Sequence, residues 1–137
     1  MNEKSIFSRL LYVAKMLYHE LYYLLCIPII QLIGGWCMRY HTPKKINSWI
    51  GYRTTNAMKN ADTWKLANQY CGKLWLMIGT VSLILSAIIG FSCLFFSKKI
   101  TAILILGMIS VQTLVLLLTI PFVEAKLKRE NTSHDKN

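Results

Sequence analysis

Charged residues are absent from two long stretches of this 137-residue chain. Residues 74–96 give 23 consecutive positions without a charge, and residues 100–123 give 24 more. About 20 apolar residues are enough to cross the ~30 Å hydrocarbon core of a bilayer as a helix. Only three residues, 97–99, separate the two runs, and a soluble domain of this length could not bury both on all sides. The sequence therefore predicts a membrane protein and not a soluble globule.

A third apolar run, residues 21–38, is shorter and contains Pro28 and Gln31. It is interrupted and begins late, and no small-x-small cleavage site follows it, so it does not fit a cleavable signal peptide. We count it as a membrane span. The predicted fold class is an all-α integral membrane protein with three transmembrane helices and a structured cytoplasmic loop, residues 39–73, between the first two.

The chain also has little of what catalysis or metal binding requires. Its four cysteines form no CxxC pair, and its three histidines do not stand at ligand spacing. Paired carboxylates and nucleophile motifs are missing from the sequence. We therefore predict a protein that is not an enzyme and uses no metal or cofactor. The second and third runs contain no Asp, Glu, Lys or Arg that would mark an ion path, which disfavours a transporter or channel component.

Acidic residues are few, and the net charge is +10. The basic residues gather at the ends of the predicted spans, where they attract anionic lipid, so membrane lipids are more plausible partners than nucleic acid. Eleven lie in the 39–73 loop and the carboxyl-terminal region, and five lie on the other side. The positive-inside rule then places the loop and the carboxyl terminus in the cytoplasm and the amino terminus outside.

We divide the chain into an amphipathic amino-terminal segment, residues 1–20, a three-helix membrane domain, residues 21–126, and a polar carboxyl-terminal tail, residues 127–137. The first segment could lie in the membrane interface or extend the first span outward. We favour the interface, because one straight helix from Ser5 to Met38 would be ~50 Å long and would overshoot the hydrocarbon core.

Small and polar residues within the spans predict how the helices pack. Ser82, Ser86 and Gly90 recur every four residues and form a stripe that lets another backbone come close. Its partner could be the third span of the same molecule or a second protomer in a homo-oligomer. Gln31 and Gln112 should each bond to a helix, a backbone carbonyl or water, because a bare amide in hydrocarbon costs several kcal/mol.

The 39–73 loop is richer in turn-forming, capping and aromatic residues than a simple connection requires. We expect the second helix to begin near Thr63, capped by Asn60 or Asp62. The planar guanidinium of Arg53 suits a carboxylate or a lipid phosphate. The candidate functional residues of the loop are Asn47, Gly51, Tyr52, Arg53, Thr54, Asn60, Trp64 and Asn68.

The loop motif, followed by two spans, resembles the SdpI family. The matching residues are Pro43, Asn47, Ile50, Gly51, Tyr52, Arg53, Thr54, Met58, Asn60, Trp64, Asn68, Gly72, Pro121 and Glu124. The resemblance implies a protein of the bacterial cytoplasmic membrane that gives resistance to a secreted, membrane-active peptide toxin. It also implies that a cytoplasmic repressor could be recruited when toxin is present. The family's namesake has additional amino-terminal spans, and we expect this protein to consist of the three-helix module without them.

Our leading hypothesis is an SdpI-like immunity protein whose loop, through Arg53, Tyr52, Asn60 and Trp64, forms the functional surface. The alternative for these residues is structural: they only fold the loop onto the membrane, with Arg53 bound to lipid phosphate or Glu124. A second class of function is a non-enzymatic accessory subunit of a larger membrane complex, associating through the stripe of small residues.

Overall fold

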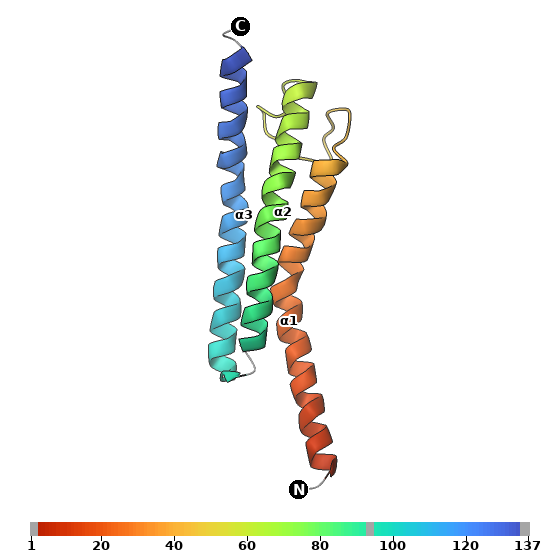
Figure 1. Cartoon of the computed structure of the whole chain (residues 1–137), viewed down its shortest axis with the longest axis vertical. Helices are drawn as coiled ribbons and strands as arrows, with labels where there is room; N and C mark the ends of the chain where they lie inside the picture. Colours follow the sequence, from red (N-terminus) through yellow and green to blue (C-terminus); the bar gives the residue numbers. More distant parts are fainter. Residues whose placement is uncertain (1–2, 93–94, 135–137) are drawn as a thin grey trace.

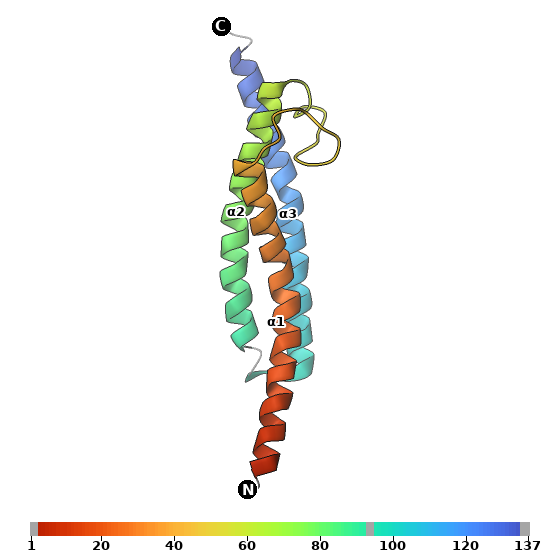
Figure 2. The ribbon, with the colours of Figure 1, turned by 90° about the vertical axis from the view of Figure 1, so that its right-hand side faces the viewer.

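Three long helices form the described part of the chain, which comprises residues 3–92 and 95–134 of the computed structural model. They are α1 (Glu3–Tyr40), α2 (Ala61–Ser92) and α3 (Lys98–His134), and they run up, down and up beside one another (Figures 1 and 2). Each helix is long and apolar enough to cross a membrane. The prediction of an all-helical fold with three helices apolar enough to span a membrane is therefore confirmed.

Helices α1 and α2 touch backbone to backbone at Gly35 and Gly72. A Cβ atom placed on Gly72 would lie 2.6 Å from the carbonyl oxygen of Gly35 and 2.6 Å from the backbone nitrogen of Arg39. No side chain fits in this space, so the contact requires glycine. The close approach fixes the end of α1 beside Gly72, and α2 extends past the end of α1 to Ala61 (Figure 1).

The stripe of small residues faces the inside of the bundle. Ser82, Ser86 and Gly90 are all buried. Gly90 lies against Leu21 and Leu24 of α1, and the hydroxyl of Ser86 accepts a hydrogen bond from Nε2 of Gln112 on α3 at 3.0 Å. Of the two partners considered for the stripe, the structure shows neighbouring helices of the same molecule.

The two buried glutamines differ in their surroundings. Gln112 donates to Ser86, but its Oε1 has no hydrogen-bond partner among the described residues. Gln31 is 1% exposed, and neither its Nε2 nor its Oε1 has such a partner there. Of the expected helix, backbone-carbonyl or water partners, the structure shows a helix partner for Gln112.

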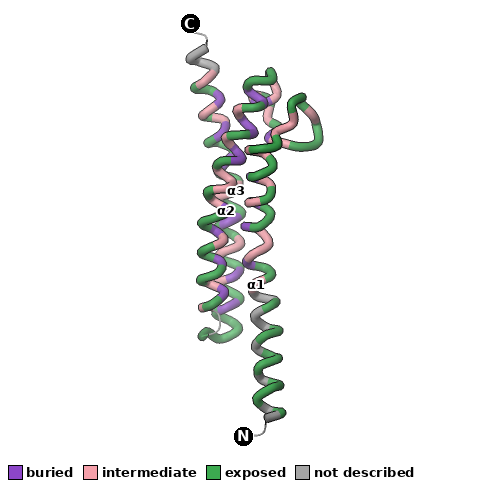
Figure 3. Tube along the Cα trace, turned by 45° about the vertical axis from the view of Figure 1, so that its right-hand side comes forward, coloured by how far each residue is buried: buried purple, intermediate pink, exposed green. Residues whose placement is uncertain are grey.

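The ends of the helices extend further than the domain limits drawn from the sequence. Helix α1 runs without a break from Glu3, because no proline or glycine precedes Pro28, and its amino-terminal end projects beyond the bundle (Figures 1 and 3). Every residue from 4 to 18 whose burial is described is exposed. At the other end, α3 continues through the predicted tail to His134, and Leu127 is buried.

Candidate functional site

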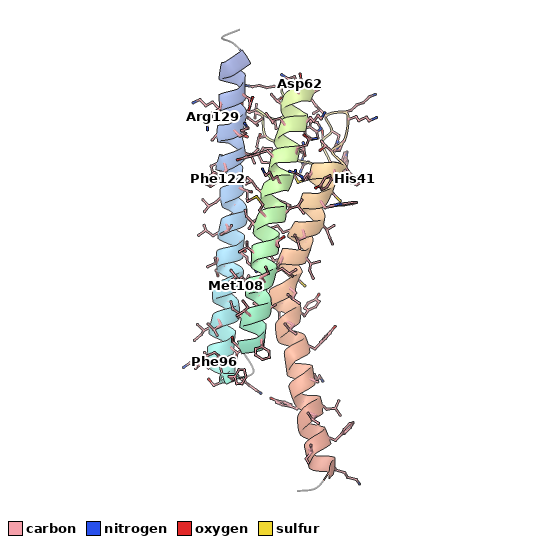
Figure 4. The ribbon with its side chains drawn as sticks, in the orientation of Figure 1. His41, Asp62, Phe96, Met108, Phe122 and Arg129 are labelled. Carbon is pink, nitrogen blue, oxygen red and sulfur yellow. The ribbon has the colours of Figure 1, made fainter. Side chains whose placement is uncertain are left out.

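The loop between α1 and α2 folds back onto the helices instead of standing free in solvent. Figure 4 shows that His41 after α1, Asp62 in α2 and Arg129 in α3 lie at the same end of the bundle, where the polar side chains gather. Beneath the loop, buried apolar side chains from three elements form a small core: Tyr52, Ala57, Ala67, Cys71, Val123 and Leu127. This core ties the loop to both α2 and α3.

Asn47 shapes the first half of the loop. Its side-chain oxygen accepts hydrogen bonds from the backbone nitrogens of Trp49, at 3.0 Å, and Ile50, at 2.8 Å. A side chain that caps its own following turn in this way is characteristic of asparagine. The turn directs the chain into Gly51 and back towards α2.

Gly51 and Tyr52 attach the loop to α2 through Asn68. Gly51 has φ +114°, a conformation that side-chain-bearing residues rarely adopt, and an added Cβ would lie 2.5 Å from Oδ1 of Asn68. That oxygen accepts the backbone N–H of Tyr52 at 2.7 Å. Asn68 is fully buried and is oriented by its own donation to the carbonyl of Trp64 at 2.8 Å. These residues form one connection between loop and helix.

Trp64 and Asn60 secure the start of α2. The indole nitrogen of Trp64, a residue 1% exposed, donates to the carbonyl of Pro43 at 2.9 Å. Oδ1 of Asn60 accepts the backbone N–H of Thr63 at 2.8 Å, and the Thr63 hydroxyl accepts the N–H of Asn60 at 3.2 Å. This reciprocal pair is an N-terminal helix cap at one of the two residues that the sequence offered.

A carboxylate on α3 accepts hydrogen bonds from several side chains in the middle of the loop. Glu124 accepts hydrogen bonds from the hydroxyl of Thr54 at 2.5 Å and the side-chain amide of Asn56 at 2.7 Å. The hydroxyl of Tyr52 lies 3.2 Å from Glu124 Oε1 and 3.1 Å from the carbonyl oxygen of Ile120, so its single proton can serve either acceptor. Glu124 therefore connects the loop to a helix about 70 positions later in the chain.

The phenol of Tyr52 is held neutral by this environment. Burial, and secondly the negative charge of the neighbouring Glu124, raise the pKa of Tyr52 well above the usual value near 10. Tyr52 thus remains a hydrogen-bond donor throughout the physiological pH range.

Arg53 is exposed, unlike the residues on either side of it. One N–H of its guanidinium donates to the carbonyl of Ser48, which holds the charged group at the edge of the loop. The alternative that Arg53 pairs with Glu124 is not seen, because neutral side chains of the loop occupy that carboxylate. The guanidinium has five N–H donors, so several of them can face a ligand.

A cavity of about 610 Å³ lies under the loop, next to Arg53. Trp75 and Cys71 of α2 line it from one side, and Leu116, Leu117 and Ile120 of α3 line it from another. Small-molecule sites commonly have volumes of this order, roughly 300–1,000 Å³. The indole nitrogen of Trp75 bonds to the hydroxyl of Thr119 at 3.2 Å, which fixes the ring between the helices.

The structure thus accounts for the predicted loop residues in two groups. Seven of them fold the loop: Asn47, Gly51, Tyr52, Thr54, Asn60, Trp64 and Asn68. Arg53 and Asn60 are the two exposed residues among the eight, and the Asn60 side chain is engaged in the cap of α2, so Arg53 is the exposed member outside this group. Sequence reasoning gave no role to Asn56, and it named Glu124 as a matching motif residue and as a possible partner for Arg53. A polar residue just after an apolar span was the available signal for Glu124.

No group of three or more His, Cys, Asp or Glu side chains that could hold a metal occurs within residues 3–92 and 95–134. The arrangement is instead one of hydrogen bonds that shape a loop beside a half-open cavity. This arrangement is suited to binding a ligand, through the exposed guanidinium of Arg53 and the apolar side chains that line the cavity.

Comparison with known proteins places this architecture in a family. The family model described as the SdpI/YfhL protein family matches residues 44–123. The match begins in the loop, covers α2 and ends in α3 at the residue before Glu124. The chain belongs to the SdpI/YfhL family. It is also 36% identical over 52 residues to a protein of Bacillus subtilis (strain 168) described as "Uncharacterized protein YfhL". That match covers 38% of this chain and 47% of the relative, so it spans about half of the relative's length. No solved structure matches the chain.

Proposed function

We propose that the chain is an SdpI-like membrane immunity protein, which gives resistance to a secreted, membrane-active peptide toxin. The main support for the proposal is the family match, which covers residues 44–60 of the loop, all of α2 and most of α3. The geometry adds where the function would reside. Seven motif residues are engaged in folding the loop, and their joint effect is to hold Arg53 outward at the edge of the cavity.

In this proposal the protein resides in the bacterial cytoplasmic membrane, with the loop and carboxyl terminus in the cytoplasm and the amino terminus outside. Two faces with unequal numbers of basic residues support the orientation. The exposed loop is also the surface on which a cytoplasmic repressor could be recruited. A Ser97→Cys variant in a background without other cysteines tests the orientation: labelling by an impermeant reagent in intact cells supports it, and labelling only after lysis contradicts it.

The accessory-subunit alternative relied on the stripe of Ser82, Ser86 and Gly90. These residues are buried against α1 and α3 of the same molecule. A partner protein would therefore have to use another surface, and the immunity proposal is favoured.

Survival of a toxin-sensitive bacterium tests the proposal directly. Cells that express the full chain should survive a sporulation-delaying-type toxin, and cells that express an unrelated three-span membrane protein at equal abundance should die. Equal killing of both strains, with the chain correctly inserted, would contradict immunity towards this class of toxin.

A further inference from the structure

The cavity under the loop combines an apolar wall with a membrane-facing side. Leu116, Leu117 and Ile120 line it from α3, within the apolar segment that is long enough to span the bilayer. Leu117 is 55% exposed and Ile120 is 45% exposed, so their side chains continue from the cavity onto the outer surface of the helix. In a membrane, that surface contacts lipid chains.

The loop side of the same cavity is polar and positively charged. Ser48, Arg53 and Thr54 line it there, and the Ser48 carbonyl holds the guanidinium in position. The Glu124 carboxylate of α3 receives its hydrogen bonds from the neutral side chains of Tyr52, Thr54 and Asn56. Within the part of the chain that the structure describes, no acidic side chain pairs with the positive charge of Arg53, and its planar fork matches the oxygens of a phosphate.

We propose that this cavity binds one phospholipid with an anionic headgroup. The phosphate would lie at Arg53, and one acyl chain would lie against Leu117 and Ile120. An ordinary soluble anion would leave the apolar wall uncovered, whereas a phospholipid satisfies both sides at once. The predominance of basic over acidic residues in the loop disfavours the ammonium of a zwitterionic headgroup. The inference depends on the membrane fold and not on the immunity proposal.

Two pairs of matched variants test the binding of lipid by the purified full-length chain. Arg53→Gln and Arg129→Gln remove the same charge, but Arg129 is exposed on α3 and does not line the cavity. Leu117→Trp and Leu118→Trp add the same bulk at neighbouring exposed positions, and only Leu117 lines the cavity. The proteins are extracted from bilayers of equal phosphatidylglycerol and phosphatidylcholine, and retained lipid is counted by native mass spectrometry.

We expect the wild type, Arg129→Gln and Leu118→Trp to retain one phosphatidylglycerol in preference to phosphatidylcholine. Arg53→Gln should retain about tenfold less, the usual scale for losing a hydrogen bond to a charged group. Leu117→Trp should lose the lipid although Arg53 is intact. Equal retention by both members of either pair would overturn the proposal.

A second measurement separates a lipid site from a site for free phosphate. The midpoint of thermal unfolding in neutral detergent should rise with added short-chain phosphatidylglycerol in the wild type and not in Arg53→Gln. Inorganic phosphate at the same concentration should have no such effect. An equal rise with inorganic phosphate would show an anion site without a lipid and would contradict the assignment of the acyl chain.

Discussion

The side-chain oxygen of Asn68 accepts the backbone N–H of Tyr52 at 2.7 Å. This contact is one of those that attach the loop to α2, and the same oxygen faces Gly51, whose positive φ brings the chain close enough. From this attachment Tyr52 extends to α3 and Arg53 turns outward. The motif residues are thus connected in space as well as in sequence.

Asn68→Ala should destabilise the protein by about 1–3 kcal/mol, because it leaves the buried N–H of Tyr52 without its acceptor. Gln69→Ala is the control, since Gln69 is an exposed neighbour on the same helix and should change stability by less than about 0.5 kcal/mol. Unfolding by denaturant in detergent, followed by circular dichroism, measures both. Equal stability of the two variants would show that the loop is held by other contacts.

Gly51→Ala should also cost about 1–3 kcal/mol of unfolding free energy. The added methyl group would stand 2.5 Å from Oδ1 of Asn68 and 3.0 Å from the Trp64 ring, in a backbone conformation that alanine rarely adopts. Gly107→Ala provides the comparison, because nothing lies within 4 Å of a Cβ at that helical position. Gly107→Ala should leave stability unchanged or slightly raised. If the two substitutions had the same effect, the loop conformation around Gly51 would be wrong.

Much of this fold could be predicted from local sequence. The spans follow from the runs without charge, and the cap at Asn60 follows from residues only three positions apart. The partners of Glu124 could not be predicted in this way, because they lie about 70 positions earlier and depend on how the helices pack. The sequence therefore indicated that the loop residues are candidate functional residues. It did not distinguish Arg53, which is exposed, from its neighbours, which fold the loop.

The extent of α1 was left open by the sequence for a different reason. The amphipathic pattern of residues 5–20 allowed either a segment in the membrane interface or an outward extension of the first span, and α1 is continuous from Glu3 to Tyr40. Amphipathicity reports which side of a helix is apolar, and it does not report where the helix ends. A break would have needed a proline or glycine, and the sequence has none before Pro28.

Tyr52 should make stability depend on pH in the alkaline range. The pKa of Tyr52 is raised in the folded state. Its full contribution to the free energy of unfolding is therefore present below about pH 10, the usual pKa of tyrosine. The contribution is then lost as the pH rises through the folded-state pKa, because the unfolded chain releases the proton first. Tyr52→Phe should flatten this dependence, and Tyr40→Phe, which removes an exposed phenol, should not.

Absorbance titration of tyrosinate in the folded protein provides a second readout of Tyr52. The last ionisation step should be missing from Tyr52→Phe and present in Tyr40→Phe. A Tyr52→Phe titration that superimposes on that of the wild type after scaling for one fewer tyrosine would contradict the buried, Glu124-facing position of the phenol.

The two buried glutamines should respond in opposite ways to replacement by methionine, which has a similar size and no amide. Gln31→Met should stabilise the fold by about 1–3 kcal/mol, because neither polar atom of Gln31 has a partner among the described residues. Gln112→Met should destabilise it by roughly 0.6 kcal/mol through loss of the bond to Ser86, the average for such bonds between membrane helices. Steric trapping or denaturant unfolding in bicelles compares them, and destabilisation by Gln31→Met would show that its amide is satisfied.

The central claim is that the motif folds the loop in order to present Arg53. It is tested most directly by toxin survival at matched membrane abundance, comparing the wild type, Arg53→Ala and Arg129→Ala. Arg53 is exposed and its loss should not lower abundance, so Arg53→Ala should insert normally and fail to protect, while Arg129→Ala protects like the wild type. Full protection by Arg53→Ala, or a loss of protection that only follows a loss of abundance, would contradict the account.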